Sequence, residues 1–310
     1  MDRHSVDWEG PCVALVTPFD SEGRIDEAAF RRNVELCLGN GVAGLLVSGC
    51  TGEFWALSKD ERKRLYRICV DAAHARVPVI GGAGAIRTED AIELADAALE
   101  AGCAGAMILP PFFVKPSADD IVAHYQAVAD AVRIPILLYN IPSAAVNALT
   151  PPLVDRLADI ETVVAIKESS FDFNNFYKTI ELAGDRIRVF GQGYPGLLVG
   201  ASGSFHVHAN YWDERSWEGY RAFRRGDHAR ARALQAQSTA IEATFTENGR
   251  NYYVSVKTAM NLFGRPGGYP RLPLRPLDEP HLSEMRSKLE ERGLVDVAPS
   301  GTVVQAAVAE

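Results

Sequence analysis

Short apolar runs alternate with amphipathic stretches of helical period from residue 12 to about residue 210. Eight of these runs are predicted strands: Val13 to Phe19, Gly44 to Gly49, Val77 to Ala83, Ala104 to Pro110, Ile134 to Ile141, Thr162 to Lys167, Ile187 to Gly191 and Ser204 to Ala209. The stretches between them, such as Asp26 to Leu38 and Ser58 to Ala73, place apolar residues on one helical face. Eight strand–helix units with short crossovers predict a closed (β/α)8 TIM barrel, of the α/β class, over residues 10–225.

The strand pattern stops after Asn210, and a Pro- and Gly-rich link runs from Arg265 to Pro276. Residues 226–296 are predicted to form a C-terminal helical extension packed on the barrel, because no part of them has enough apolar surface to fold alone. Its last helix is predicted from about Glu279 to Arg292. Residues 297–310 have no such pattern and are predicted to be a flexible tail.

The composition suits a globular protein that needs no disulfide or metal to hold its core, since 47% of the 310 residues are hydrophobic and 23% are charged. A net charge of -8 without any Lys/Arg cluster argues against nucleic acid and anionic membranes as partners, which leaves small molecules. No signal-like stretch or long apolar span is apparent, so the chain is predicted to be cytoplasmic. Five cysteines without CxxC or paired spacing predict reduced thiols and no metal site.

Lys167 is the strongest candidate for covalent chemistry. It ends a strand whose other residues are typical of a fully buried parallel strand. Burial lowers the pKa of an amine, and a neutral amine at the mouth of a barrel can attack a ketone. The alternative is structural: the side chain reaches solvent from the strand end or pairs with Glu168.

Tyr139 ends the preceding strand, one strand–helix unit before Lys167. Neighbouring barrel strands bring their carboxyl ends side by side, which is where barrel active sites are built. A phenol beside an amine can move protons as a general acid or base. The alternative is a tyrosine that only packs on an apolar strand.

The segment Ser48 to Glu53, with the sequence SGCTGE, follows the second predicted strand. Its glycines allow backbone N–H groups to turn inward and hold a carboxylate, with the hydroxyl of Thr51 as a further donor. A second glycine cluster, Gly81 to Gly84, lacks the pattern of a phosphate-binding loop and is predicted to serve strand packing and a turn.

Together these residues resemble the dihydrodipicolinate synthase and N-acetylneuraminate lyase family of class I pyruvate aldolases. Three motifs in the same order carry the resemblance, which covers nearly the whole barrel: Gly49-Cys50-Thr51-Gly52-Glu53 for G-[ST]-[ST]-G-E, Tyr139-Asn140-Ile141-Pro142 for Y-N-x-P, and Ile166-Lys167-Glu168 for the Schiff-base lysine. The resemblance implies that Lys167 condenses with pyruvate or a related 2-keto acid and that Tyr139 moves the protons. It also implies that the N–H groups of Cys50 and Thr51 hold the carboxylate. No metal or organic cofactor is expected, because the protonated imine is itself the electrophile.

Two residues depart from the family's proton relay. Cys50 stands where the family commonly has a hydroxyl residue that links the catalytic tyrosine to a second tyrosine, and a thiol is a weaker hydrogen-bonding group. Phe113 stands where the family often has that second tyrosine, which reaches across a subunit interface. Neither departure removes the lysine or the first tyrosine.

The second half of the substrate is also expected to differ. Ala144 replaces the arginine with which dihydrodipicolinate synthases hold aspartate semialdehyde, and the segment Gly191 to Tyr194 lacks the acidic residues with which sialic acid lyases bind the sugar chain. We therefore expect a smaller or less polar partner, with Ser169 and Gly191 as substrate contacts. Candidate apolar walls are Phe54, Trp55, Phe112, Phe113, Phe171 and Phe205. His206 and His208 alternate on the last predicted strand and are predicted to be buried structural residues. If Phe205 and Val207 face the barrel interior, both histidines point toward the helices.

Three functions remain open at this stage. The favoured one is an aldolase or lyase that cleaves or condenses a 2-keto acid with pyruvate as one partner. The second is a 2-keto-3-deoxy sugar acid dehydratase that uses the same lysine imine. The third is a catalytically inactive keto-acid-binding barrel, suggested by Cys50 and Phe113. The paired aromatics Phe112 and Phe113 resemble the family's dimer contact, so a homotetramer built from dimers is expected.

Overall fold

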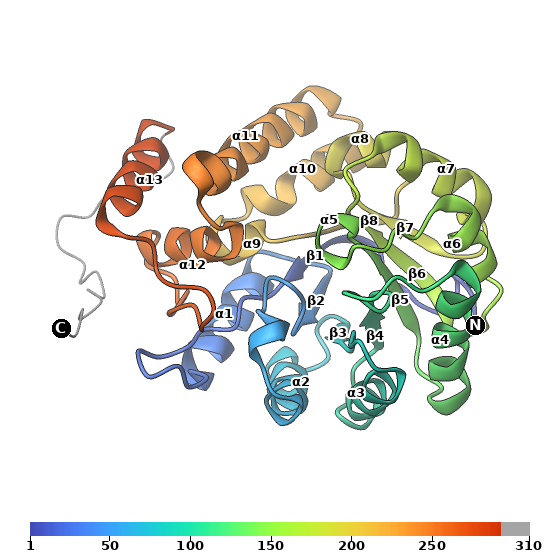
Figure 1. The fold of residues 1–310 in the computed structure, drawn as a ribbon. Coiled ribbons are helices and arrows are strands. Elements are labelled where there is room, and N and C mark those ends of the chain that lie inside the picture. Colours follow the sequence, from blue (N-terminus) through green and yellow to red (C-terminus); the bar gives the residue numbers. More distant parts are fainter. Residues whose placement is uncertain (293–310) are drawn as a thin grey trace.

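The computed structural model describes residues 1–292, and its core is a closed barrel of eight parallel strands in the order β1 to β8 (Figure 1). The predicted TIM barrel is therefore confirmed. The strands are β1 (Gly10–Ala14), β2 (Gly44–Val47), β3 (Val79–Gly82), β4 (Gly105–Ile108), β5 (Ile136–Asn140), β6 (Val163–Glu168), β7 (Arg188–Phe190) and β8 (Gly203–His206). Each strand pairs with its sequence neighbours, and β1 closes the ring on β8.

Helices follow the strands and cover the outside of the barrel. They are α1 (Glu27–Gly39), α2 (Lys59–Ala73), α3 (Thr88–Glu100), α4 (Ala118–Ala131), α5 (Pro142–Ala145), α6 (Pro151–Leu157), α7 (Phe173–Ala183), α8 (Gly193–Leu198), α9 (His208–Tyr211) and α10 (Arg215–Arg224). Two of the best defined starts are capping boxes, in which Ser58 pairs with Glu61 and Ser117 with Asp120. Among the helices of residues 1–292, none combines the length and hydrophobicity that crossing a membrane requires.

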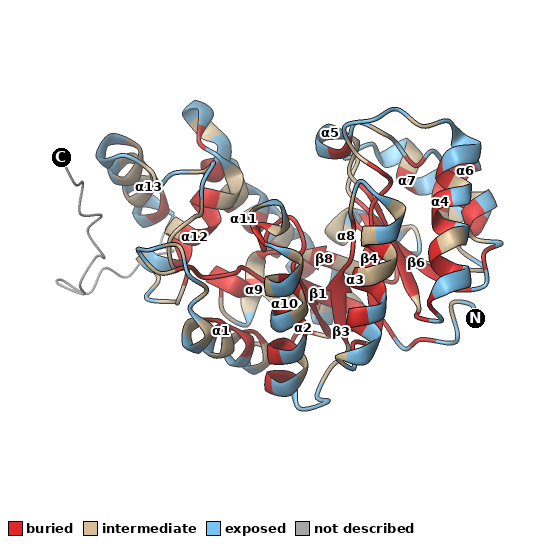
Figure 2. Ribbon diagram, turned by 60° about the horizontal axis from the view of Figure 1, so that its bottom comes forward, coloured by how far each residue is buried: buried red, intermediate tan, exposed pale blue. Residues whose placement is uncertain are grey.

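Strand residues alternate between two apolar layers, and both are buried (Figure 2). One layer, here called the inner core, fills the barrel and includes Leu46, Met107, Tyr139, Phe190 and Phe205. The other lies between the strands and the covering helices. Burial of one large apolar side chain stabilises the folded state by roughly 1.5–3 kcal/mol. These two layers therefore hold the strands, and the side chains at their ends, in fixed positions.

The C-terminal extension consists of α11 (His228–Thr246), α12 (Tyr252–Leu262) and α13 (Glu279–Glu291), which lie together on one side of the barrel (Figure 1). These helices share an apolar cluster that includes Trp212, Phe245 and Met260. The predicted boundary after residue 225 lies in the turn between α10 and α11, and these two helices pack together. Residues 293–296 of the predicted extension and the predicted tail, 297–310, lie outside the described residues.

The first predicted strand, Val13 to Phe19, is wrong in its bounds, because β1 runs from Gly10 to Ala14. The apolar run continues past β1 as a buried loop rather than as a strand. There Phe19 forms isolated bridges with Ile25 and with Tyr269 of the C-terminal region. Apolar residues in this loop bury against the extension, and a one-dimensional pattern does not separate that kind of burial from burial in a sheet.

Candidate active site

Lys167 and Tyr139 meet at the carboxyl ends of β6 and β5. The register of these neighbouring strands sets Tyr139 directly opposite Lys167. Both side chains are buried, and the Lys167 Nζ lies 4.2 Å from the centre of the Tyr139 ring. The amine and the phenol that the sequence singled out are therefore brought together at the end of the barrel where the loops after the strands gather.

Burial changes the acid–base behaviour of the lysine. It lowers the pKa of Lys167 from 10.5 to about 8, while the neighbouring Cys50 acts weakly in the opposite direction. At pH 7 an amine with a pKa of about 8 is neutral in about a tenth of molecules, against about one in three thousand for an unperturbed lysine. A substantial fraction of Lys167 can therefore act as a nucleophile.

Glu168 does not neutralise Lys167, so the predicted alternative of a Lys167–Glu168 pair is wrong. The Glu168 carboxylate accepts hydrogen bonds from the side chains of Asn140 (2.6 Å) and Asn175 (3.1 Å) and from the backbone N–H of Ser170 (2.7 Å). Because side chains alternate along a strand, Glu168 faces away from Lys167 and ties β5, β6 and α7 together. Within residues 1–292 the amine therefore has no carboxylate partner, and the bonds of Glu168 fix the strand ends on either side of it.

The loop after β2, residues 48–53 and here called the nest loop, has the shape of an anion-binding nest. Ser48 has a φ of 56°, and Cys50 and Thr51 are buried. Among residues 1–292, no backbone carbonyl accepts a hydrogen bond from the N–H of Cys50 or of Thr51. The nest loop passes close to β3, and glycine at position 82 makes this possible. Any side-chain carbon on Gly82 would stand only 2.1 Å from the Ser48 carbonyl oxygen. The predicted packing role of the Gly81 to Gly84 cluster is confirmed.

A group of hydroxyls and one thiol surrounds Tyr139. Burial, followed by the nearby Cys50 and Tyr253, raises the pKa of Tyr139 well above 10.0, while a hydrogen bond with Ser169 lowers it. Burial also raises the pKa of the Cys50 thiol, against smaller lowering effects of Lys167, Tyr139 and Tyr253. The phenol and the thiol therefore both stay protonated at neutral pH, and both can donate protons.

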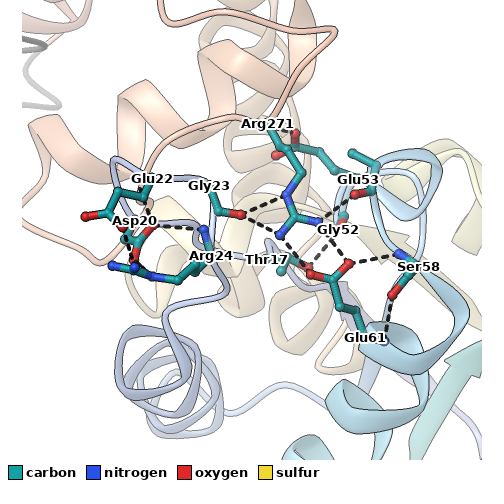
Figure 3. A network of polar contacts seen from close by, with 11 residues as sticks. Thr17, Asp20, Glu22, Gly23, Arg24, Gly52, Glu53, Ser58, Glu61 and Arg271 are labelled. Atoms are coloured by element: carbon teal, nitrogen blue, oxygen red, sulfur yellow. Dashed lines mark hydrogen bonds and ion pairs between the residues drawn. The ribbon is translucent and has the colours of Figure 1, made fainter.

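The C-terminal extension anchors the other end of the nest loop. Glu53, with a φ of 54°, forms a buried ion pair with Lys257 of α12, and its second oxygen accepts the backbone N–H of Arg271 at 3.1 Å. Figure 3 shows the Arg271 guanidinium between the Gly23 carbonyl and Glu61, which it contacts with two bonds of 2.9 Å. The loop is therefore fixed from both sides, and its shape depends on residues more than 200 positions away.

Sequence reasoning missed Tyr253, Lys257 and Arg271. The extension was expected only to pack, and its residues carry none of the three motifs. One signal was present: Lys257 is the single charged residue of α12, in an otherwise uncharged stretch of mostly apolar residues. A lone charge in such a helix indicates a buried partner, because an unpaired buried charge is too costly to keep.

The remaining predicted contacts separate into two groups. Phe205 lies in the inner core with its ring 5.1 Å from that of Phe190, and Gly191 lies where a side-chain carbon would stand 2.5 Å from the Glu168 carbonyl oxygen. Phe54 and Phe112 pack against the inner core. Phe113 and Phe171 are instead at the surface, 85% and 84% exposed. A place for either in the wall of the site stays a prediction.

The two histidines near β8 stack on each other, with ring centres 4.6 Å apart. His208 Nε2 lies 3.1 Å from Glu242, and burial lowers the pKa of His206 well below 6.5, so that His206 is neutral. The condition set for the histidines does not hold at Val207: β8 ends at His206, and Val207 packs in the cluster of the C-terminal helices rather than in the inner core. The strand's alternation stops where α9 begins.

Comparisons with known proteins agree with this site. The model of the dihydrodipicolinate synthetase family matches residues 7–292. The chain is 36% identical over 291 residues to a 4-hydroxy-tetrahydrodipicolinate synthase of Alkalilimnicola ehrlichii, covering 92% of this chain and 99% of that protein. Among solved structures, a prophage protein of the dihydrodipicolinic acid synthase family from E. coli K12, in complex with pyruvate, superposes with a TM-score of 0.89 at 28% identity, covering 93% of this chain and 100% of that one. Dihydrodipicolinate synthase from Aquifex aeolicus superposes with a TM-score of 0.87 at 30% identity, covering 94% and 100%.

Fold, buried lysine and these matches together define a lyase of the class I aldolase type. The chain belongs to the dihydrodipicolinate synthetase family.

Proposed function

We propose that this enzyme is a Schiff-base aldolase that cleaves or condenses a 2-keto acid, with pyruvate as one partner. One observation carries the proposal: a buried amine with a pKa lowered to about 8 lies over the ring of a buried tyrosine at the mouth of the barrel. An amine that is partly neutral and a phenol that is fully protonated are the two groups that imine formation requires.

The proposed reaction begins when the Lys167 Nζ bonds to the keto carbon and the carbonyl π electrons move to the oxygen, which takes a proton from Tyr139. Tyr139 recovers a proton from the nitrogen and then donates it to the hydroxyl, which leaves as water. This step gives a protonated imine opposite a phenolate. The phenolate then removes a proton from C3, and the electrons flow into the iminium to form an enamine that can attack an aldehyde.

The nest loop suits the keto acid's carboxylate. The N–H groups of Cys50 and Thr51 carry no backbone acceptor among the described residues, and the buried Thr51 also has a hydroxyl that can donate. Fixed donors of this kind hold an anion without reorganisation. We propose no metal or organic cofactor, since the iminium accepts the electrons that a Lewis acid would otherwise stabilise.

The second substrate is proposed to lack a carboxylate at the position that Ala144 faces. Ala144 lies in α5, a short helix opened by Pro142, and offers no cation. The relative from Alkalilimnicola ehrlichii is named as a 4-hydroxy-tetrahydrodipicolinate synthase. In this chain, Ser169 beside Tyr139 is the proposed hydroxyl contact. Gly191 and Phe205, which lies in the inner core, are the proposed further substrate contacts. We expect activity with neutral or hydroxylated aldehydes rather than with aspartate semialdehyde.

Pyruvate release tests the aldolase assignment. A panel of 2-keto-3-deoxy acids is incubated with the enzyme, and lactate dehydrogenase with NADH reports pyruvate. An aldolase releases pyruvate in proportion to the substrate consumed. Consumption without pyruvate contradicts the assignment in favour of a dehydratase, and imine formation without turnover of any substrate contradicts it in favour of a binding barrel.

The pH dependence of imine formation follows from the lowered pKa of Lys167. A lysine whose pKa is lowered to about 8 is mostly protonated below that pH and mostly neutral above it. The rate of adduct formation with pyruvate is therefore expected to rise about tenfold per pH unit below about pH 7 and to level off above about pH 8.5. Quenched-flow trapping across this range measures it, and a rate that still climbs steeply beyond about pH 10 would show an unperturbed amine.

We also propose a homotetramer built from dimers. Phe113, Val146 and Phe171 are exposed apolar residues on loops after β4, β5 and β6, and Asn147 ties the first two loops together through the Pro111 and Val114 carbonyls. Exposed apolar groups of this kind mark a contact with another chain. Light scattering should give four chains per particle, and Phe113→Asp with Val146→Asp should give fewer. A matched change on α3, Leu99→Asp, should leave the mass unchanged, and a monomeric wild-type protein would contradict the proposal.

A further inference from the structure

Two side chains of α12 reach the nest loop from the same face of the helix. Tyr253 and Lys257 are four residues apart, so they lie one above the other. Lys257 pairs with Glu53 at the end of the loop, and Tyr253 packs against the inner core. The Tyr253 ring also lies 4.9 Å from that of Trp55. The ion pair therefore fixes the height of α12, and with it the position of the Tyr253 phenol.

Cys50 and Tyr139 both belong to the inner core, and Tyr253 packs against it. The Tyr253 phenol neighbours the thiol of Cys50, which in turn neighbours the phenol of Tyr139. Exposure falls along this series: Tyr253 is partly buried, while Cys50 is 8% and Tyr139 2% exposed. The three groups thus run from the edge of the barrel mouth to the phenol beside Lys167. Each carries one exchangeable proton, and burial keeps that proton in place at neutral pH.

We propose that Tyr253 completes a proton relay, Tyr139 to Cys50 to Tyr253, and that it does so from within the same chain. This inference rests on the proposed Schiff-base function. After the Tyr139 phenolate has taken a proton from C3, the Tyr139 O–H bond breaks and that proton moves to the Cys50 sulfur, while the Cys50 S–H proton moves to the Tyr253 oxygen and the Tyr253 O–H proton passes to solvent. Run in reverse, the relay returns a proton from solvent to Tyr139, which gives it back to C3. No group is oxidised or reduced, and each proton that leaves is replaced.

The relay does not use Phe113, which has no hydroxyl and lies at the surface. Tyr253 touches no reacting atom in this scheme and acts through Cys50, so it is a positioning residue. Because a thiol is a weaker hydrogen-bond donor and acceptor than a hydroxyl, Cys50 is the slow link. Completion from α12 also gives the C-terminal extension a role in catalysis beyond packing.

A double-mutant cycle on proton exchange tests the relay. In D2O the enzyme exchanges the methyl protons of pyruvate for deuterium through the enamine, and proton NMR follows the loss without any second substrate. Tyr253→Phe is expected to lower the exchange rate at saturating pyruvate by roughly tenfold, a part of the 10² to 10⁴ that general acid–base catalysis supplies. Its pyruvate KM should stay within about twofold. Cys50→Ala should cause a similar loss, Cys50→Ser should not, and Tyr253→Phe should cost nothing further once Cys50 is alanine.

The matched control is Tyr252→Phe, because Tyr252 precedes Tyr253 on α12 but its hydroxyl donates to Glu242 at 3.0 Å. This variant should exchange at the wild-type rate. Wild-type exchange by Tyr253→Phe, equal losses in both tyrosine variants, or losses that add fully in the double variant would each overturn the relay. Borohydride trapping of the pyruvate imine separates the two proposals: a wild-type enzyme that forms no adduct refutes both, whereas adduct in every variant together with additive losses refutes the relay alone.

Discussion

Replacing Tyr139 with phenylalanine is expected to lower the rate of deuterium exchange into pyruvate by on the order of 10²-fold or more. The phenol is the proton donor that the proposed mechanism uses beside the Lys167 amine, and the centre of its ring lies 4.2 Å from that nitrogen. Phenylalanine keeps the ring and its packing in the inner core. The loss should therefore appear in the rate at saturating pyruvate, and the melting temperature should change little.

Tyr125→Phe is the matched control for this change. Tyr125 is as deeply buried as Tyr139, but its hydroxyl donates to the Ile108 carbonyl at 3.0 Å in the outer layer, between strands and helices. That variant should lose some stability and no more than about twofold in rate. A Tyr139→Phe enzyme within about threefold of the wild type, or an equal loss in Tyr125→Phe, would remove Tyr139 from the mechanism.

Replacing Lys257 with methionine is expected to lower the free energy of unfolding by about 3–5 kcal/mol. Lys257 and Glu53 are both 1% exposed, and the Lys257 Nζ also donates to the Tyr269 carbonyl at 2.7 Å. Without the lysine, the Glu53 carboxylate is left buried without its cation. Urea denaturation measures the change, and the loosened nest loop should raise the KM for pyruvate in the same variant.

Two controls identify the cause of that loss. Adding Glu53→Gln to Lys257→Met removes the stranded charge and should recover part of the stability. Lys59→Met breaks two ion pairs on the surface, with Asp90 and Glu93, where the Lys59 side chain is 42% exposed. It should cost no more than about 1 kcal/mol. Equal effects of the buried and the exposed substitution would show that the Glu53–Lys257 pair does not hold the loop.

The barrel and the reacting pair could be predicted from the sequence because both depend on local patterns. Strand periodicity gave eight units, and parallel strands in a barrel always bring their carboxyl ends together. Tyr139 and Lys167 end consecutive strands, so their meeting follows once the barrel is assumed. The nest loop was found in the same way, since its glycines and its position after a strand are local features.

The rest of the site depends on contacts between distant segments. Tyr253 and Lys257 meet the loop of Cys50 and Glu53 only because α12 packs beside that loop. No periodicity in α12 says which of its polar residues face that loop. Phe113 is ambiguous for a related reason: an aromatic residue after a barrel strand can line the cavity or face another chain, and the pattern is the same for both.

The most direct test of the central claim is the site of the covalent adduct. The enzyme is incubated with pyruvate, reduced with borohydride, and examined by intact-mass and peptide-mapping mass spectrometry, with Lys167→Ala in parallel. One reduced pyruvate adduct per chain, located on Lys167 and absent from the variant, is the predicted result. An adduct on another lysine, an adduct that survives in Lys167→Ala, or no adduct in the wild-type enzyme would contradict the account.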